Sequence, residues 1–380
     1  MPTTVLIPTA PGDLHAGAVA LALRHKGALP VPWLTPDFPM RTGETLAFES
    51  GRLAIRVQGP GIDLGGDRGD QGDRIDRIDT VWNRRPAHAI DRERLHAADL
   101  PFAERSCEIF RRSLFELLAA GAFWVNSDPA VRRDSKPRQH AVAVAVGLET
   151  PDTLYTNDPE EIRGFLRRQG GRIVYKPLLP ATWRTADELL SPYTSVLTEE
   201  MLVADELLRA APGIFQALVP KAWELRITVV GHHVLGARVL SQETESGRLD
   251  WRKAYGELRM EPCEVESGLA ARCVELLARL GLVFGCFDFV VTPDGRTVFL
   301  EVNQMGQFLF VEEYTGQPLL DAFAELLIQG RPDFTWSPAR AGIRFADVVA
   351  EAEESCRREL RDHLPAPTRA WDEAAEPAPS

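Results

Sequence analysis

The segment from Cys286 to Asn303 constrains the fold most, because it predicts a β-hairpin that carries carboxylates on one face. It reads CFDFVVTPDGRTVFLEVN, two apolar runs joined by a Pro-Asp-Gly turn. Side chains alternate between the two faces of a strand, so the register decides whether Asp288 and Glu301 meet. A three-residue loop with a bulge at Gly295 would put the two acids on opposite faces. A four-residue loop pairs them and keeps both apolar rows on one face, and the apolar pattern favours it.

The favoured register also predicts a metal site. It fixes the neighbouring pairs, which are expected to be Val291 with Val298 and Phe289 with Leu300. Asn303 then lies on the same face as the two carboxylates. Like charges directly opposite each other destabilise a hairpin unless a cation lies between them. Hard oxygen ligands of this kind suit Mg²⁺ that also binds phosphate oxygens. The alternative is a surface hairpin with scattered acids.

Composition indicates a globular protein of the reducing cytoplasm. The chain has 380 residues, enough for two or three domains, and 44% of them are apolar. No apolar run approaches the roughly 20 residues of a membrane span. The N-terminus lacks the basic region of a signal peptide. The five cysteines have neither metal nor disulfide spacing, and the net charge of −12 argues against nonspecific nucleic-acid binding. We therefore expect a cytoplasmic protein without nucleic-acid or membrane partners.

The order of elements predicts an N-terminal open α/β domain followed by further sheets. A strand at 4–8 precedes a helix at 15–25, which is the opening of such a domain. Later strands are expected at 80–83, 122–126, 172–176, 214–219, 225–230 and 234–240. Later helices are expected at 102–120, 135–146, 267–280 and from 318 to near 330. Residues after about 364 are rich in Pro, Ala and Glu and are expected to be disordered.

Two lysines are candidates for holding phosphate. The chain has no Walker-type or G-x-G-x-x-G loop, so a nucleotide must be bound in another way. Lys176 ends a predicted strand directly before Pro177, and Lys136 begins a predicted helix. A lysine can neutralise phosphate charge as a point donor, although an isolated lysine is more often a surface residue. Their order relative to the other motifs favours the phosphate role.

Short segments in a fixed order carry a resemblance to a known family. They are VWNRRP at 81–86, VN at 125–126 followed by KPRQ at 136–139, GLETPDT at 147–153, YTS at 193–195, PGIFQ at 212–216, WELRITVVG at 223–231, DWR at 250–252, and FLEVN at 299–303 with Gly306 and Gln307. This order resembles that of the ATP-grasp ligases, in which two β-sheet subdomains clamp ATP. More narrowly, it is similar to the graspetide synthetases, the microviridin-type peptide macrocyclases.

The resemblance implies an α/β fold with an ATP-grasp clamp of the α+β type. The implied divisions are an N-terminal open α/β pre-ATP-grasp domain at 1–127, a central subdomain with a lid at 128–211, a C-terminal subdomain with the magnesium site at 212–330, and an extension at 331–380.

The resemblance also implies roles for individual residues, with ATP and Mg²⁺ as cofactors. Lys136 and Lys176 would contact the phosphates. The hinge that reads adenine through backbone groups would be Gln216, Ala217, Leu218 and Val219, and Glu224 would contact the nucleotide. Arg226 and Arg238 would bind the transferred phosphoryl group and the acyl phosphate, and Arg252 would face the acceptor. Asp288, Glu301 and Asn303 would hold Mg²⁺.

The implied reaction is peptide macrocyclisation. A carboxylate is a poor electrophile, and phosphorylation by ATP gives it a good leaving group. The implied enzyme activates Asp or Glu side chains of a ribosomal precursor peptide, made of leader and core, as acyl phosphates. A hydroxyl or amine of the same peptide then attacks, which closes an ω-ester or ω-amide ring. The alternatives are a ligase that adds a free amino acid or amine, and a catalytically silent ATP- or peptide-binding protein. Homodimeric assembly also remains open.

Overall fold

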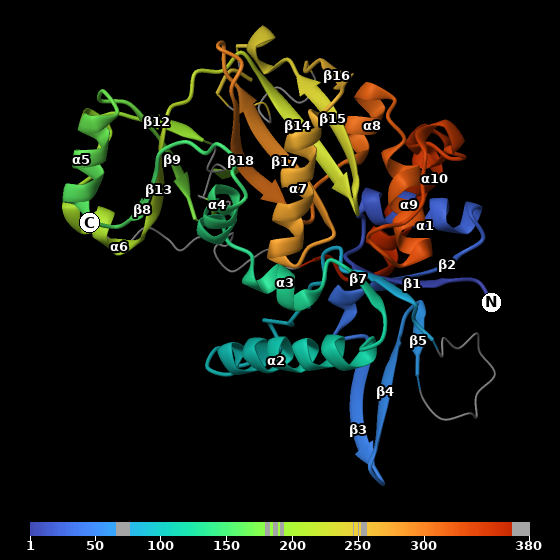
Figure 1. Ribbon diagram of the computed structural model, residues 1–380. Coiled ribbons are helices and arrows are strands. Elements are labelled where there is room, and N and C mark those ends of the chain that lie inside the picture. The colour runs from blue at the N-terminus through green and yellow to red at the C-terminus, as the bar shows by residue number, and fades with distance from the viewer. Residues whose placement is uncertain are drawn as a thin grey trace.

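The computed structural model describes residues 1–65, 77–178, 183–184, 189–190, 194–245, 247–249, 251 and 257–366. Within these ranges the chain forms a mixed α/β structure, as the sequence predicts (Figure 1). None of the helices in these ranges is long and apolar enough to cross a membrane.

The N-terminal sheet is parallel and has the strand order β2-β1-β6-β7. Its strands are β1 (Thr4–Thr9), β2 (Leu29–Leu34), β6 (Thr80–Trp82) and β7 (Phe123–Val125). Helix α1 (Leu14–His25) joins β1 to β2, and Asp13 caps it by accepting hydrogen bonds from the amides of His15 and Ala16. Every residue of β1 is buried, as expected for a parallel strand covered on both faces. The predicted open α/β arrangement is confirmed.

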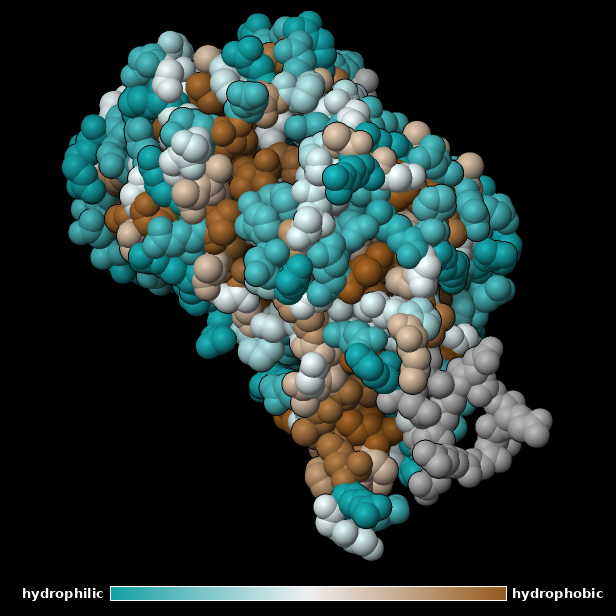
Figure 2. All heavy atoms as spheres, turned by 45° about the vertical axis from the view of Figure 1, so that its right-hand side comes forward, coloured by the Kyte–Doolittle hydropathy of each residue, from teal (hydrophilic) through white to brown (hydrophobic). Residues whose placement is uncertain are grey.

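A hairpin that the sequence did not reveal projects from this sheet (Figure 1). An antiparallel sheet contains β3 (Gly43–Glu49), β4 (Arg52–Gly59) and β5 (Ile62–Leu64), and α2 (Leu100–Leu118) lies near its base. Figure 2 shows apolar surface on the projecting part, where Phe48 is 75% exposed. Leu46 and Ile55 pair across β3 and β4 and pack on the buried cluster of the N-terminal domain.

The central part of the chain forms a small antiparallel sheet with the strand order β12-β9-β13-β8. Its strands are β8 (Thr153–Thr156), β9 (Ile173–Pro177), β12 (Ser195–Leu197) and β13 (Gly213–Ala217). Strands β10 (Trp183–Arg184) and β11 (Leu189–Leu190) pair with each other. The helices of this part are α3 (Asp128–Arg133), α4 (Lys136–Ala145), α5 (Pro159–Arg168) and α6 (Asp205–Ala210). Ile162 and Phe165 of α5 pack on Ile173 and Phe215 of the sheet.

The largest sheet has five antiparallel strands in the order β16-β15-β14-β17-β18. They are β14 (Trp223–Val230), β15 (His233–Val239), β16 (Met260–Cys263), β17 (Phe284–Val291) and β18 (Thr297–Asn303). Helix α7 (Ser267–Leu280) covers one face of the sheet (Figure 1). Leu276 and Leu277 of this helix share a buried cluster with Phe287. The helix ends at Gly281, whose φ of +78° is left-handed, as the sequence predicts.

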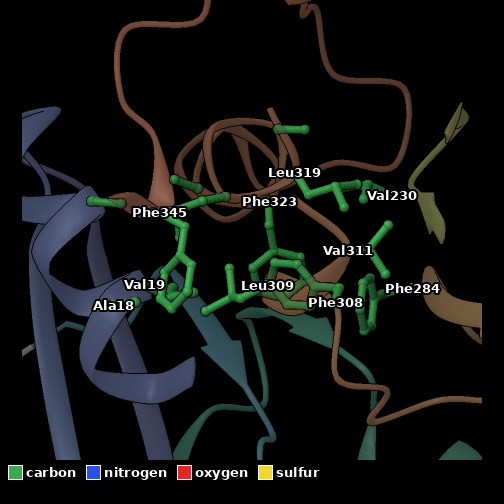
Figure 3. Close-up of a cluster of buried hydrophobic side chains, with 14 of the residues drawn as sticks. Ala18, Val19, Val230, Phe284, Phe308, Leu309, Val311, Leu319, Phe323 and Phe345 are labelled. Carbon is green, nitrogen blue, oxygen red and sulfur yellow. The ribbon is translucent and has the colours of Figure 1, made fainter. Parts of the chain in front are cut away.

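Three C-terminal helices belong to a buried cluster that also contains residues of α1 and of the five-stranded sheet. They are α8 (Leu309–Thr315), α9 (Leu319–Gln329) and α10 (Phe345–Asp362). Figure 3 shows Val19 of α1 close to Phe345 and Leu309, with Phe323 beside them. Helix α10 lies in the segment 331–380 and packs against α1, so it belongs to the core. The domain boundaries at 127, 211 and 330 stay a prediction, and disorder beyond about 364 falls mostly outside the described residues.

Candidate active site between two sheets

A pocket of about 670 Å³ lies between the small central sheet and the five-stranded sheet. The strands β9 and β13 supply one wall, and β14, β17 and β18 supply another. The first residue of α4 also reaches the pocket. All predicted nucleotide and metal residues line it, namely Lys136, Lys176, Gln216, Ala217, Leu218, Val219, Glu224, Asp288, Glu301 and Asn303. Residues that lie far apart in the sequence therefore meet around one space.

The β17–β18 hairpin places its two carboxylates opposite each other. Asp288 pairs with Glu301 in the register, as the sequence predicts. Asn303 lies two residues farther along β18 and pairs with Cys286. Since side chains repeat every second residue along a strand, Glu301 and Asn303 share a face.

The path to this pairing differs from the predicted one. The pairs expected to be Val291 with Val298 and Phe289 with Leu300 are wrong, because Val291 pairs with Thr297 and Phe289 with Phe299. The turn is the shorter loop, in which the Thr292 amide donates to the Arg296 carbonyl at 2.9 Å. Gly295 adopts the left-handed φ of +87° that such a loop requires.

A bulge then restores the pairing of the acids. The register shifts between Asp288 and Phe289, and Leu300 is the extra residue on β18. A bulge of this kind opposes two residues on one strand to one on its partner. Leu300 lines the pocket as a result.

Arg226 neutralises the first carboxylate. It pairs with Asp288 on the adjacent strand, and its Nη1 lies 2.8 and 2.9 Å from the two carboxylate oxygens. Burial lowers the pKa of Arg226, but the neighbouring Asp288 charge more than offsets this effect, so the pKa is raised. Arg226 Nη2 also donates to the Gln307 carbonyl at 3.1 Å, and its Nε is buried without a partner among the described residues. The guanidinium is therefore fixed beside Asp288.

Lys136 neutralises the second carboxylate. Its Nζ lies 3.0 Å from Glu301 Oε2, and both side chains are about one third exposed. The described residues contain no group of three His, Cys, Asp or Glu side chains able to hold a metal. The predicted set has two carboxylates and an amide oxygen instead. These are hard oxygen donors on one hairpin face, which fits Mg²⁺ completed by phosphate or water oxygens.

At the opposite wall, Lys176 is tied to the predicted hinge. Its Nζ lies 3.0 Å from Gln216 Oε1, and Gln216 Nε2 donates to Thr153 Oγ1 at 3.0 Å. Strand β13 ends at Ala217, whose amide donates to the Asp152 carbonyl. Leu218 is therefore the first residue beyond the sheet. These bonds hold a cation at the pocket wall next to the segment predicted to read adenine.

Glu224 has a partner that the sequence reading missed. Lys221 Nζ lies 2.8 Å from Glu224 Oε1, and Lys221 also lines the pocket. Burial raises the pKa of Glu224, and the nearby Lys221 charge opposes this rise only in part. Lys221 lies in the loop before β14, where the i,i+3 rule for helices does not apply, so the sequence carried no local signal for this pair.

Gln139 was also missed, although it lies in the KPRQ segment. Its Nε2 donates to the Val302 carbonyl at 2.9 Å, and its Oε1 accepts from the Val302 amide at 3.1 Å. The side chain is 6% exposed and lines the pocket. It therefore joins α4 to the strand that carries Glu301 and Asn303.

Arg238 does not lie with Arg226. Arg226 pairs with Ala237, whereas Arg238 pairs with Leu225, so the two arginines point to opposite faces of the sheet. Arg238 stacks over the Trp223 ring at 4.4 Å and lines a second pocket of about 400 Å³. The role predicted for Arg238 with the phosphoryl group or the acyl phosphate stays a prediction, and the position of Arg238 on the opposite face does not favour it. Arg252 lies outside the described residues.

Solved structures provide the comparison, since no family model and no curated protein matches the chain. One neighbour is a Chryseobacterium gregarium RiPP-associated ATP-grasp ligase in complex with ADP and a leader and core peptide. It is 26% identical, with a TM-score of 0.76 over 88% of this chain and 100% of that one. The fold is that of the ATP-grasp ligases.

Two further solved structures, a macrocyclase and an ATP-grasp ligase, are similar to this chain. Macrocyclase MdnC from Microcystis aeruginosa, bound with precursor peptide MdnA, is 26% identical, with a TM-score of 0.74 over 86% of this chain and 99% of that one. The ATP-grasp ligase PsnB, complexed with a precursor variant, Mg and ADP, is 26% identical, with a TM-score of 0.64 over 87% and 99% of the two chains. The predicted ATP-grasp fold and the predicted similarity to peptide macrocyclases are confirmed.

Proposed function

We propose that this protein is an ATP- and Mg²⁺-dependent ligase that closes macrocycles in a ribosomal precursor peptide. Similarity over nearly the whole length to ligases that bind precursor peptides and ADP supports this function. One observation carries the proposal most directly. The Asp288–Glu301 pair lines one pocket between two sheets together with Lys136 and Lys176.

The pocket has the charges that a nucleotide with its metal needs. Lys176 and Lys136 would contact phosphate oxygens as point charges. Gln216 to Val219 would hold the adenine, with Glu224 contacting the nucleotide. Asp288, Glu301 and Asn303 would hold Mg²⁺, which when bound neutralises phosphate charge during transfer.

The chain's own residues would then organise the acyl transfer. Arg226 is a fixed guanidinium beside Asp288, so it would stabilise charge that develops on the transferred phosphoryl group without reorganising. A peptide Asp or Glu carboxylate takes the γ-phosphoryl group and becomes an acyl phosphate. A Thr or Ser hydroxyl, or a Lys amine, of the same peptide attacks the carbonyl and displaces phosphate. Arg252 would serve the acceptor side. Arg238 is not assigned to this site, because it lies on the opposite face of the five-stranded sheet from Arg226.

Three further expectations remain part of the proposal. The partner is a precursor peptide with a leader and a core, the location is the cytoplasm, and assembly as a homodimer is an open alternative.

The proposal is tested by measuring the mass of the peptide by mass spectrometry. The purified protein is incubated with ATP, Mg²⁺ and a precursor peptide encoded by a neighbouring Thr- and Glu-rich or Lys- and Asp-rich reading frame, without added amino acids. Each ring closed by condensation lowers the peptide mass by about 18 Da. Successive ATP-dependent losses of this size support the cyclase. A mass gain only when a free amino acid is added would instead establish the intermolecular ligase, and ATP binding without any mass change would establish a silent binder.

A further inference from the structure

The loop that follows Asn303 is held by side chains of the N-terminal domain. Residues 304–309 run from the end of β18 into the first residue of α8 and lie directly after the predicted metal strand. Their backbone groups bond to three distant side chains. Asn126 Nδ2 donates to the Gln304 carbonyl at 2.9 Å, Arg84 Nη1 donates to the Met305 carbonyl at 2.6 Å, and His15 Nε2 accepts from the Phe308 and Leu309 amides at 3.1 and 3.3 Å.

These side chains are themselves fixed. Arg84 is 1% exposed, and its Nε donates to Asp13 Oδ2 at 2.9 Å. Asn126 is 2% exposed and bonds to the backbone of Val283 and Phe284 as well as to the loop. The side-chain amide of Asn126 has both its nitrogen and its oxygen bonded, so it leaves the loop little freedom.

His15 is held as a hydrogen-bond acceptor. Burial lowers its pKa to about 3, and the charge of Arg84 adds to this effect while Asp13 opposes it. The ring is therefore neutral at physiological pH, and Nε2 keeps the lone pair that faces the two amides. Its ring also packs edge-on against Phe308, with centroids 5.3 Å apart.

The loop also packs closely against β17, which restricts the positions that its backbone can take. A Cβ added at Gly306 would lie 2.6 Å from the Cβ and Sγ atoms of Cys286. A Cβ atom does not approach non-bonded carbon or sulfur atoms this closely, so the backbone at Gly306 is packed directly against β17. The loop is thus fixed by packing on one side and by N-terminal side chains on the other.

A chain of bonds leads from this loop into the pocket. The Met305 carbonyl accepts from Arg84, and the Met305 amide donates to Asn303 Oδ1 at 3.1 Å. Two residues later the Gln307 carbonyl accepts from Arg226. The orientation of Asn303 and the position of Arg226 therefore both depend on where this loop lies.

We propose that His15, Arg84 and Asn126 are positioning residues of the ligation site. They act through residues 304–309 and set the orientation of Asn303. The inference rests on the proposed function, since it assigns Asn303 to the metal. Hydrogen-bond partners behind a ligand typically change metal affinity or activity by about 10- to 100-fold when removed.

The test compares variants of His15 that differ in one property. His15→Leu removes the acceptor at similar volume, and His15→Gln keeps an acceptor. His25→Leu is the matched control, because His25 lies exposed at the other end of α1. The affinity for fluorescently labelled ADP is measured without metal and over a series of Mg²⁺ concentrations, on protein whose fold is checked by circular dichroism.

His15→Leu should need about 10-fold more Mg²⁺ to strengthen ADP binding, while its affinity for ADP without metal stays unchanged. His15→Gln should recover to within about threefold of the parent, and His25→Leu should match it. A role in stability alone would lower the melting temperature without moving the Mg²⁺ response of the folded protein. A parental Mg²⁺ response in His15→Leu, or no recovery in His15→Gln, overturns the inference.

Arg84→Lys supplies a second variant if His15→Leu does not fold. It keeps a charge beside Asp13 but lacks the second guanidinium nitrogen that donates to the Met305 carbonyl, so the same loss of Mg²⁺ response is expected. A parental response in this variant also contradicts the inference. If the parent protein shows no Mg²⁺-dependent ADP binding, the proposed function itself fails, which separates the two failures.

Discussion

The Nζ atom of Lys136 lies 3.0 Å from Oε2 of Glu301, so a predicted phosphate ligand is paired with a predicted metal ligand. Both side chains are about one third exposed, and such a pair costs little to break. Nucleotide and metal arriving together would give each side chain a stronger partner. Metal arriving alone would have to displace the lysine.

Lys136→Met should therefore separate the two binding events. We expect ATP binding in the presence of Mg²⁺ to weaken by about 10-fold, because one phosphate contact is lost. Binding of Mn²⁺ alone, followed by electron paramagnetic resonance, should become tighter, because Glu301 is released. Arg133→Met is the control, since it removes an exposed cation three residues earlier that does not line the pocket. Unchanged Mn²⁺ affinity in Lys136→Met would contradict the idea that the metal displaces Lys136 from Glu301.

Glu301→Gln should reduce ATP turnover by about 100-fold or more while the fold is retained. The amide keeps the shape and loses the charge that the metal needs. ADP release in a coupled assay measures the effect. Glu313→Gln, on the exposed side of α8, should turn over ATP at the parental rate. Near-parental turnover in Glu301→Gln would show that the hairpin does not hold the metal.

The two arginines should behave differently because they lie on opposite faces. Arg226→Ala should lower product formation by about 100- to 1,000-fold. It should also destabilise the fold by about 3–5 kcal/mol, because Asp288 loses the partner of a largely buried ion pair. Arg238→Ala should keep product formation within about threefold of the parent. Equal losses in both variants would mean that Arg238 reaches the reaction by another route.

Acid should destabilise the protein partly through His15. Its folded pKa of about 3 is below the unfolded value of 6.5, so the unfolded state binds more protons between these limits and stability falls as the pH drops through them. Between pH 7.5 and 5.5 this residue alone should cost about 1 kcal/mol. The loss in unfolding free energy, taken from urea titrations, should be smaller by that amount in His15→Gln. Identical losses would place a charged or exposed imidazole at this position.

The sequence predicted that Asp288 pairs with Glu301, but it did not predict the backbone geometry that produces this pairing. The pairing of Asp288 with Glu301 followed from alternation, but two irregularities produced it, a short loop at Gly295 and a bulge at Leu300. Each shifts the register by one residue, so their effects cancel at the acids. The adjacent Phe299 and Leu300, both apolar, were the signal of a bulge that alternation alone does not resolve.

Two further features of the site were not predicted from the sequence, namely the opposite faces of the two arginines and the contacts of residues 304–309. The predicted strands at 225–230 and 234–240 leave a three-residue turn, which would place Arg226 opposite Arg238. Strand β15 begins one residue earlier, at His233, so the turn is 231–232 and the two arginines lie on opposite faces. The contacts of the 304–309 loop could not be predicted from the sequence. They join residues 178, 221 and 293 positions apart, and local patterns carry no information about such pairs.

The origin of the phosphate oxygen tests the central claim most directly. A precursor peptide with ¹⁸O in its Asp and Glu carboxylates is incubated with the protein, ATP and Mg²⁺, and the released phosphate is weighed. An acyl phosphate passes one labelled oxygen to phosphate for each ring closed, which raises the phosphate mass by about 2 Da. Labelled inorganic phosphate in a one-to-one ratio with rings is the predicted result. Unlabelled phosphate alongside ring closure, or label in AMP instead, would contradict the account.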